Sequence, residues 1–451
     1  MINIVLFFLY SFLFSFLIYK WKFCQDKEIK SFVFPLLFGV KLFFGLLFYV
    51  VYTYYYTDRY TSDMYKYFDD SKPLFDCLIQ DPRTFFQIVF SDRSGSSNAM
   101  PYMQQMNHWQ LGYHRQFENS HQLIILFNVL CRFFSFGNIL PHFVFINFLS
   151  FLGLICLWKS FNLFFTNKKP LFLLSVFLIP SVLFWCSGLL KESLIIFALG
   201  FSLYSFFLFL RRDKNQLIHF TFFLLFYFLL FKIKSYMAVS FLPLVLIGIA
   251  LWISKFRFVI PIFVIGILAV IIMGFGIQSI FPSINPTRAL NDKIEGFKEV
   301  MTAANPASKF DIGSNEDMDS ETLLKLIPKS VAVCLFRPFP WEAKNPFTIL
   351  VVLENFIFWT GLLICLFFFF RHEQYKRLGP QQTFLLLSII SSASILCFII
   401  GISSFNFGAL VRYKAPILIF LFSLPIMLIS DKIVEKLNNL KILGILLNKR
   451  Q

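Results

Sequence analysis

The stretch that decides the fold is 171–210, LFLLSVFLIPSVLFWCSGLLKESLIIFALGFSLYSFFLFL, in which Lys191 and Glu192 are the only charged residues. A bilayer core about 30 Å thick requires roughly 20 apolar residues for each helix that crosses it. The apolar runs 171–187 and 192–210, on either side of the charged pair, approach this length. The stretch therefore predicts two membrane-spanning helices joined by a short charged turn.

The rest of the chain has the same character, because 57% of its 451 residues are hydrophobic and only 15% are charged. A soluble domain of this size needs a more charged surface. Apolar runs of suitable length fall at 3–19, 31–55, 138–158, 171–187, 192–210, 216–232, 236–254, 257–280, 346–370, 382–402 and 411–430. We therefore predict an all-α, polytopic transmembrane helical bundle of about 11 spans, with residues 1–451 as a single integral membrane domain.

The basic residues indicate how the bundle is oriented. They gather in short connections such as 20–30, 211–215 and 371–380, and basic residues in short loops mark the cytoplasmic side. We therefore expect a multi-pass protein of the inner (cytoplasmic) membrane, with its N-terminus outside and its C-terminus in the cytoplasm. The net charge of +16 then reflects topology, and nucleic acid is not expected as a partner.

Three segments do not fit the pattern of spans. The polar stretches 57–120 and 278–345 are long, and the orientation makes both of them periplasmic loops. The segment 121–136 is apolar but short and contains Arg132, so we expect an interfacial or re-entrant helix there.

The cysteines and histidines do not form a metal-binding pattern. The eight cysteines are scattered and show no CxxC motif, so neither a zinc site nor a disulfide framework is expected. No cofactor is predicted and no residue is assigned to a metal. A divalent cation held by an aspartate of the first loop remains an open alternative.

Ionisable residues concentrate at the span ends that face the predicted periplasm. Such groups are costly near a membrane, which makes them functional candidates. Asp63 lies in the first outer loop, and the pair Lys191 and Glu192 lies in an outer turn. Each of these residues also has an explanation without a functional role. An aspartate can be a solvated loop charge, and a lysine can extend its apolar stem along the membrane so that its charge reaches the interface.

The string Arg337–Glu342, RPFPWE, is the most distinctive of these groups. Its two prolines stiffen the backbone and hold Arg337 and Glu342 in a fixed relation. Trp341 suits either the membrane interface or the face of a sugar. The alternative is a rigid interfacial anchor closed by its own salt bridge. Farther along, Glu354 falls inside the next span and needs a partner.

The loops that face the cytoplasm are too short to fold a pocket for a soluble nucleotide-activated substrate. An enzyme of this kind would receive its substrate through the membrane, which points to a lipid-linked donor. Cations neutralise a departing phosphate or diphosphate, and a carboxylate takes a proton from an acceptor hydroxyl. We assign the catalytic role to Asp63, Glu342 and Glu192, lipid phosphate binding to Arg337, Arg412, Lys191, Lys232, Lys234 and Lys414, and substrate binding to Tyr65, Trp341 and Tyr413.

Two short motifs resemble those of a known family. Ser62-Asp63-Met64-Tyr65 resembles the aspartate followed by an aromatic residue in the first outer loop of bacterial polysaccharide polymerases of the Wzy and EpsG kind, and more broadly of GT-C glycosyltransferases. Arg412-Tyr413-Lys414-Ala415-Pro416 resembles the basic-aromatic-basic-x-Pro string near the end of such chains. Many GT-C enzymes carry an adjacent acidic pair in this loop, whereas Asp63 stands alone and Asp69-Asp70 follow later. This departure leaves metal use and the identity of the base open.

The resemblance implies a sugar or oligosaccharide on undecaprenyl phosphate or diphosphate as donor, and another glycan at the periplasmic face as acceptor. We therefore expect a hexosyltransferase-type glycosyltransferase, most simply a repeat-unit polymerase for O-antigen, capsule or exopolysaccharide. Membrane lipids and other polysaccharide-assembly proteins would be its partners. The rivals are a transporter or flippase of lipid-linked glycans, which usually keeps its ionisable groups near the bilayer midplane, and a non-catalytic envelope membrane subunit.

Overall fold

The computed structural model describes residues 2–56, 58–90, 97–106, 121–212, 214–280, 287–288, 290–292, 294–295, 320–438 and 447. In these ranges the secondary structure is helical and includes no strand. Nine of the described helices are long and apolar enough to cross a membrane: α1 (Ile2–Lys20), α2 (Val33–Val50, continued to Tyr55 by a wider turn), α8 (Ile139–Phe164), α11 (Lys191–Leu210), α12 (Gln216–Ile233), α13 (Ser235–Ile253), α17 (Pro346–Arg371), α18 (Pro380–Ser403) and α19 (Phe407–Leu428). The multi-pass, all-helical prediction is confirmed at this level.

The predicted number of about 11 spans differs from these nine helices at two places. The run 171–187, expected as one span, is divided into α9 (Lys169–Phe177) and α10 (Pro180–Trp185). Pro180 explains the division, because proline lacks an N–H and disfavours helical backbone in the residue before it. The run 257–280 corresponds to α14 (Val259–Ile280), whose fully described apolar part is Val259–Val270.

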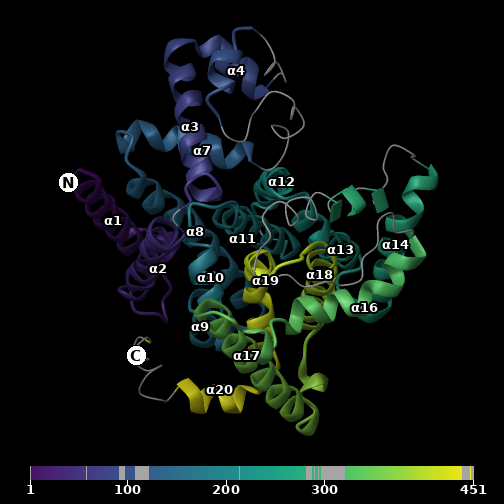
Figure 1. Cartoon of the computed structure of the whole chain (residues 1–451). Coiled ribbons are helices and arrows are strands. Elements are labelled where there is room, and N and C mark those ends of the chain that lie inside the picture. The colour runs from purple at the N-terminus through teal and green to yellow at the C-terminus, as the bar shows by residue number, and fades with distance from the viewer. Residues whose placement is uncertain are drawn as a thin grey trace.

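The stretches expected as periplasmic loops contain helices of their own. The first stretch contains α3 (Asp63–Gln80), α4 (Pro82–Phe90) and the short α5 (Met100–Met103), and α3 and α4 extend from the bundle at the top of Figure 1. In the second, α16 (Ser320–Phe336) packs on α18. The expected interfacial segment is α7 (Gln122–Ser135), which contacts α3 and α8. Residues 91–96, 107–120 and most of 281–319 lie outside the described part.

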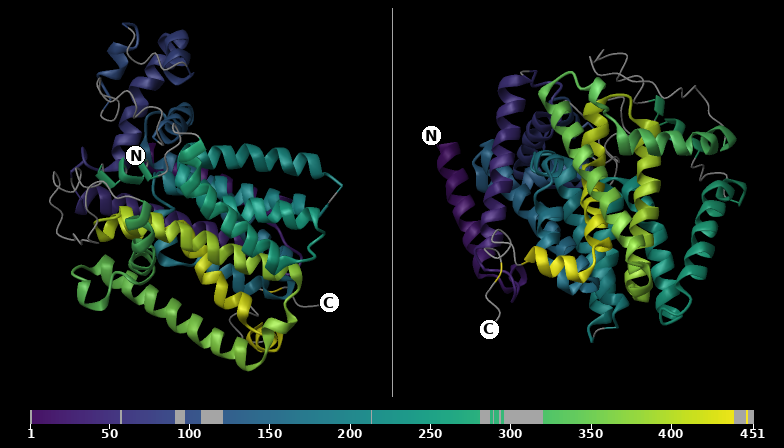
Figure 2. Two further views of the ribbon diagram at one scale, coloured as in Figure 1. Left: turned by 90° about the vertical axis from the view of Figure 1, so that its right-hand side faces the viewer. Right: turned by 90° about the horizontal axis from the view of Figure 1, so that it is seen from below.

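Helices α8 and α11 form the centre of the bundle. Gly153 of α8 faces Gly200 of α11 so closely that a Cβ on Gly200 would lie 2.1 Å from the Gly153 carbonyl oxygen. Small residues allow this approach, which is a common way for helices to associate in membranes. Figure 1 shows α8, α10, α11 and α19 in the middle, with α1 and α2 on one flank and α14 and α16 on the other. The two views of Figure 2 show the long helices running side by side.

The connection between α10 and α11, residues 186–190, is irregular and buried. Irregular backbone inside a membrane bundle requires hydrogen-bond partners from the protein. Lys41 of α2 supplies one, since its Nζ donates to the Cys186 carbonyl at 2.5 Å and to Ser187 Oγ at 3.1 Å. Asn147 of α8 donates to the Ser187 carbonyl at 2.8 Å. These bonds fix the point at which α11 begins.

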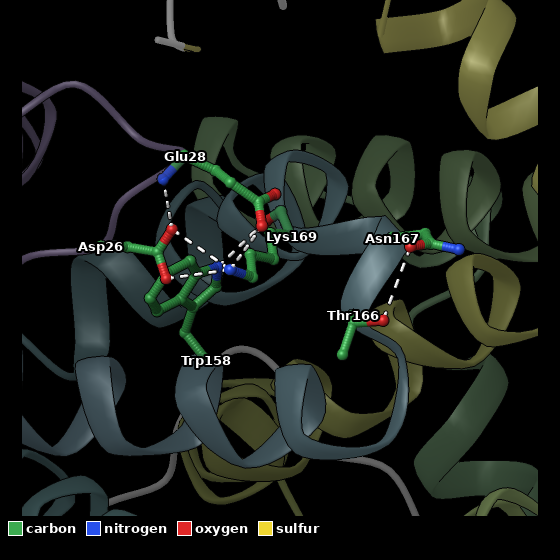
Figure 3. A network of polar contacts seen from close by, with 6 residues as sticks. All are labelled: Asp26, Glu28, Trp158, Thr166, Asn167 and Lys169. Atoms are coloured by element: carbon green, nitrogen blue, oxygen red, sulfur yellow. Dashed lines mark hydrogen bonds and ion pairs between the residues drawn. The ribbon is translucent and has the colours of Figure 1, made fainter. Parts of the chain in front are cut away.

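A separate set of polar contacts joins helices near the C-terminal end of α19. Lys169, the first residue of α9, lies 3.1 Å from Asp26 and 2.9 Å from Glu28, and its carbonyl accepts a hydrogen bond from Trp158 Nε1 at 3.0 Å (Figure 3). The neighbouring Lys168 donates to two carbonyl oxygens at the end of α19, at 3.0 and 2.6 Å. α20 (Asp431–Asn438) follows directly.

Candidate functional site

Charged residues from four separate parts of the chain form one group, here named the ionic cluster: Asp63, Glu192, Lys234 and Arg412. Arg412 Nη1 donates to Asp63 Oδ2 at 2.6 Å, and Arg412 Nε lies 3.1 Å from Glu192 Oε2. Lys234 Nζ donates to Glu192 Oε1 at 2.9 Å. Asp63 and Arg412 are 349 positions apart in the sequence, so tertiary packing assembles the cluster.

The ends of helices place each member of the cluster. Asp63 begins α3, and Glu192 lies in the first turn of α11. Both carboxylates therefore lie at helix N-termini, where the helix dipole favours negative charge. Lys234 has extended backbone in the turn between α12 and α13, and Arg412 lies in the second turn of α19.

Burial differs among the four side chains. Glu192 has 0% of its side chain exposed and Arg412 has 13%, whereas Asp63 has 34%. Burying a charge is costly unless a partner compensates for it, which explains why Glu192 contacts two cations. Asp63 is consequently the member that a molecule outside the protein reaches most easily.

The surroundings of Asp63 also change the pKa of its carboxyl group. Burial by itself raises the pKa of the Asp63 carboxyl, but the charge of Arg412 and its hydrogen bond, together with the charge of Lys191, outweigh burial. The pKa of Asp63 therefore lies well below its ordinary range, and the side chain is a carboxylate at neutral pH.

Two tyrosines border the cations of this region. The Tyr413 ring centre lies 3.9 Å from Lys234 Nζ, a distance typical of a cation–π contact. Lys191, which precedes Glu192, is buried, and its Nζ lies 6.0 Å from the Tyr67 ring centre. Lys191, Lys234, Arg412, Glu192 and Asp63, all predicted from the sequence, are thus brought together.

Tyr65, predicted to bind substrate, lies in the same turn of α3 as Asp63 but has its own partners. Its hydroxyl is 2.7 Å from Thr53 Oγ1, and the Arg59 guanidinium lies 4.1 Å from its ring centre. Only 6% of Tyr65 is exposed. These contacts fix the ring between α2 and α3, beside the cluster.

The segment Arg337–Glu342 forms a second ionic group. Arg337 Nε lies 3.2 Å from Glu342 Oε1, and Glu342 Oε2 accepts a hydrogen bond from the Phe339 N–H at 2.8 Å. The fixed relation expected between Arg337 and Glu342 is therefore present in the geometry. Trp341 stacks on Phe339 with ring centres 4.9 Å apart and is 77% exposed.

Lys414 connects this second group to α19. Its Nζ lies 3.3 Å from the Arg337 carbonyl oxygen and 3.1 Å from Asn355 Oδ1. Residues two apart in a helix do not share a face, so Lys414 and Arg412 lie on different sides of α19. The predicted residues thus fall into two neighbouring groups, and Lys232 belongs to neither: it is exposed, with its Nζ 5.8 Å from the Phe228 ring.

Sequence reasoning missed Lys41, which holds the connection that leads into Glu192. The signal was a single lysine inside the apolar run 31–55, where a buried cation requires partners. Tyr67 was also missed, because alternation of aromatic and charged residues in a polar stretch does not reveal which ring is buried. In the part of the chain that the structure describes, no group of three or more His, Cys, Asp or Glu side chains is arranged to hold a metal ion.

Comparison with known proteins assigns no relative to this chain. No protein-family model, no curated protein and no solved structure matches it.

Proposed function

We propose that this multi-pass membrane protein is a glycosyltransferase acting on polyprenyl-linked sugars at the periplasmic face of the inner membrane, most simply as a polysaccharide repeat-unit polymerase. The observation that supports the proposal is the ionic cluster. Membrane bundles rarely keep charges buried without a functional reason. Here Asp63, Glu192, Lys234 and Arg412 are contributed by four distant segments to one place.

The proposal includes an orientation. The N-terminus lies outside and the C-terminus lies in the cytoplasm, with α14 and the divided segment α9–α10 among about 11 crossing elements. In that arrangement α3 and the start of α11 face the periplasm. The glycan acceptor would approach from this side.

The charges of the site suit an anionic donor. Lys234 and Arg412 contribute two cations beside the carboxylates Asp63 and Glu192, and the buried side chain of Lys191 lies close to them. Arginine binds phosphate oxygens through two parallel N–H groups. The polyprenyl phosphate or diphosphate would therefore bind Arg412 and the adjacent lysines, with Arg337 and Lys414 nearby.

The reaction transfers a glycan, through its anomeric carbon, from the lipid phosphate to an acceptor hydroxyl. The acceptor oxygen forms a bond to the anomeric carbon, and the bond between that carbon and the phosphate oxygen breaks. The polyprenyl phosphate or diphosphate leaves with the electron pair, and the acceptor proton passes to a carboxylate. Asp63 is the better placed base, because it is partly exposed while Glu192 is enclosed and holds Arg412 and Lys234. Glu342 remains a candidate base beside Arg337.

The test uses the full chain reconstituted in lipid nanodiscs with a polyprenyl diphosphate oligosaccharide as both donor and acceptor. Mass spectrometry should detect products that grow by whole repeat units, together with free polyprenyl diphosphate. Arg412→Gln and Asp63→Asn should lower the rate at least about 100-fold, within the range that positioned acid–base and charge-stabilising groups contribute.

The control is Lys325→Gln, which removes an exposed cation of α16 that pairs with Glu321 within its own helix. This variant should keep the wild-type rate. Chain growth that is unchanged in correctly folded Arg412→Gln and Asp63→Asn would refute the proposal. In sealed proteoliposomes, which separate the two faces of the bilayer, movement of the substrate across the membrane with its mass unchanged would favour the flippase instead.

A further inference from the structure

A cavity of about 250 Å³ lies between α2, α10, α17 and α19. Its wall is mostly apolar and includes Phe44, Leu47, Phe184 and Leu350. Leu47 of α2 and Leu350 of α17, which line the cavity, are 38% and 58% exposed. The cavity therefore opens sideways between α2 and α17, toward the lipid that surrounds a membrane protein.

One carboxylate is buried in this apolar wall. Glu354 of α17 is 4% exposed, and its Oε2 accepts a hydrogen bond from the backbone N–H of Ser181 at 2.7 Å. This bond satisfies a free amide at the start of α10. The other oxygen, Oε1, is buried and has no hydrogen-bond partner among the residues that the structure describes. A buried polar atom without a partner is unfavourable, so Oε1 is suited to a ligand.

The nearby cation Lys414 does not supply this bond. A lysine ammonium has three donors. Those of Lys414 are directed at Asn355 Oδ1 at 3.1 Å and at the carbonyl oxygens of Arg337 and Cys334 at 3.3 and 3.4 Å. Glu354 Oε1 is thus left without a donor, in a side chain that lines the cavity.

We propose that the cavity binds a long-chain lipid whose headgroup donates a hydrogen bond to Glu354 Oε1, while its hydrocarbon chain lies against the apolar wall. The required chemistry is an apolar chain with an N–H or O–H donor at its head. Two sources share that chemistry: a bilayer phospholipid with an ethanolamine or glycerol headgroup, and a polyprenyl-linked sugar. The site is separate from the ionic cluster, and the proposal does not depend on glycosyl transfer.

The depth of the cavity agrees with a headgroup at Glu354. Asn355, the next residue, contacts Lys414, which lies two residues from Arg412. Gly408, one helical turn before Arg412, lines the same cavity. The bound headgroup would therefore lie at the level of the charged residues, with its chain extending along α2 and α17.

The first test varies the lipid and leaves the protein unchanged. The purified full chain is exchanged into micelles that contain one lipid each: phosphatidylethanolamine, its N-monomethyl form, its N,N-dimethyl form, or phosphatidylcholine. All four lipids carry the same acyl chains. Native mass spectrometry counts the lipid molecules that stay bound. Retention should fall as donors are lost, with phosphatidylcholine retained about tenfold less, the loss of one hydrogen bond to a charged group. Separate samples with phosphatidylglycerol and with a polyprenyl phosphate sugar distinguish the two sources. The proposal would be overturned if phosphatidylcholine, which has no donor, were retained as well as every lipid that has one.

The second test varies the protein. Glu354→Gln keeps the shape of the side chain and an oxygen for the Ser181 N–H, but places an amide donor in the cavity, so the preference for donor headgroups should disappear. Gly408→Leu should fill the cavity and abolish retention of every lipid, because a Cβ at Gly408 has only Asn406 Oδ1 within 4 Å, at 3.4 Å. An unchanged preference in Glu354→Gln, or unchanged retention in Gly408→Leu, would show that the lipid binds elsewhere. If either variant fails to fold, the lipid series with the natural chain still decides the question.

Discussion

The two ends of α19 hold charges in different ways. Near its start, Arg412 contacts two carboxylates, and Glu192 among them has no exposed side-chain surface. Near its C-terminal end, Lys169 pairs with Asp26 and Glu28, whose side chains are 20% and 59% exposed. The two groups therefore differ in Glu192, a carboxylate that is fully enclosed, whereas both carboxylates that Lys169 contacts keep some exposed surface.

The difference matters because burial decides what an ion pair contributes. An exposed pair stabilises a protein by about 0–1 kcal/mol, since water and salt screen it. A buried pair is costly to assemble and strongly destabilising to break, and it is often no better for stability than apolar residues. We infer that the pair at Lys169 joins helices, while the ionic cluster is retained for a function.

The largest effect is expected from Arg412→Met, which removes the cation but keeps an unbranched apolar stem. Asp63 and Glu192 then lose a shared partner, and the free energy of unfolding in detergent should fall by about 3–5 kcal/mol. Chemical denaturation monitored by tryptophan fluorescence measures it. Arg412→Lys, which keeps the charge, should lose less. A loss below about 1 kcal/mol in Arg412→Met would place this cluster in the same class as the solvated pair.

A smaller loss of stability is expected from Lys41→Met. This change tests whether the hydrogen bonds of Lys41 hold the connection that leads to Glu192. The Cys186 carbonyl and Ser187 Oγ would lose a buried donor, at a cost of about 1–3 kcal/mol. Lys22→Met, a change at an exposed position in the short 3-10 helix Lys22–Cys24 after α1, is the control, and its free energy of unfolding should stay within about 0.5 kcal/mol of that of the natural chain. Equal stability of both variants would mean that the irregular connection 186–190 does not need Lys41.

Much of the bundle was predictable because apolar run length is a local property. The run 346–370 matches α17, Pro346–Arg371, and the run 216–232 matches α12, Gln216–Ile233. The division at Pro180 was not predicted, because hydropathy alone does not register a missing N–H. The helices α3 and α16 fall in stretches that were interpreted as loops. The polar composition of α3 hides a surface that packs only within the fold, whereas α16 coincides with an amphipathic stretch around Leu323 to Leu335.

The site was predictable in its membership but not in its arrangement. Charges at the ends of apolar runs identified Asp63, Glu192, Lys234 and Arg412, because such charges are costly and therefore informative. Which of them pair depends on helix rotation: Arg412 and Lys414 stand two residues apart and contact different helices. The sequence alone does not show which helix each face of α19 contacts, because that depends on how α19 packs in the bundle.

The smallest effect is expected from Lys169→Ala, at the other end of α19. The Lys169 side chain is 16% exposed, but Asp26 and Glu28 remain in contact with solvent after the change, so neither carboxylate is left buried and alone. The free energy of unfolding should fall by about 0–1 kcal/mol. The effect should shrink further in 1 M salt, where the screening length is about 3 Å, whereas the loss in Arg412→Met should hardly change with salt. A loss in Lys169→Ala as large as that in Arg412→Met, and equally insensitive to salt, would show that burial does not separate the two ends and would remove the reason for assigning function to only one of them.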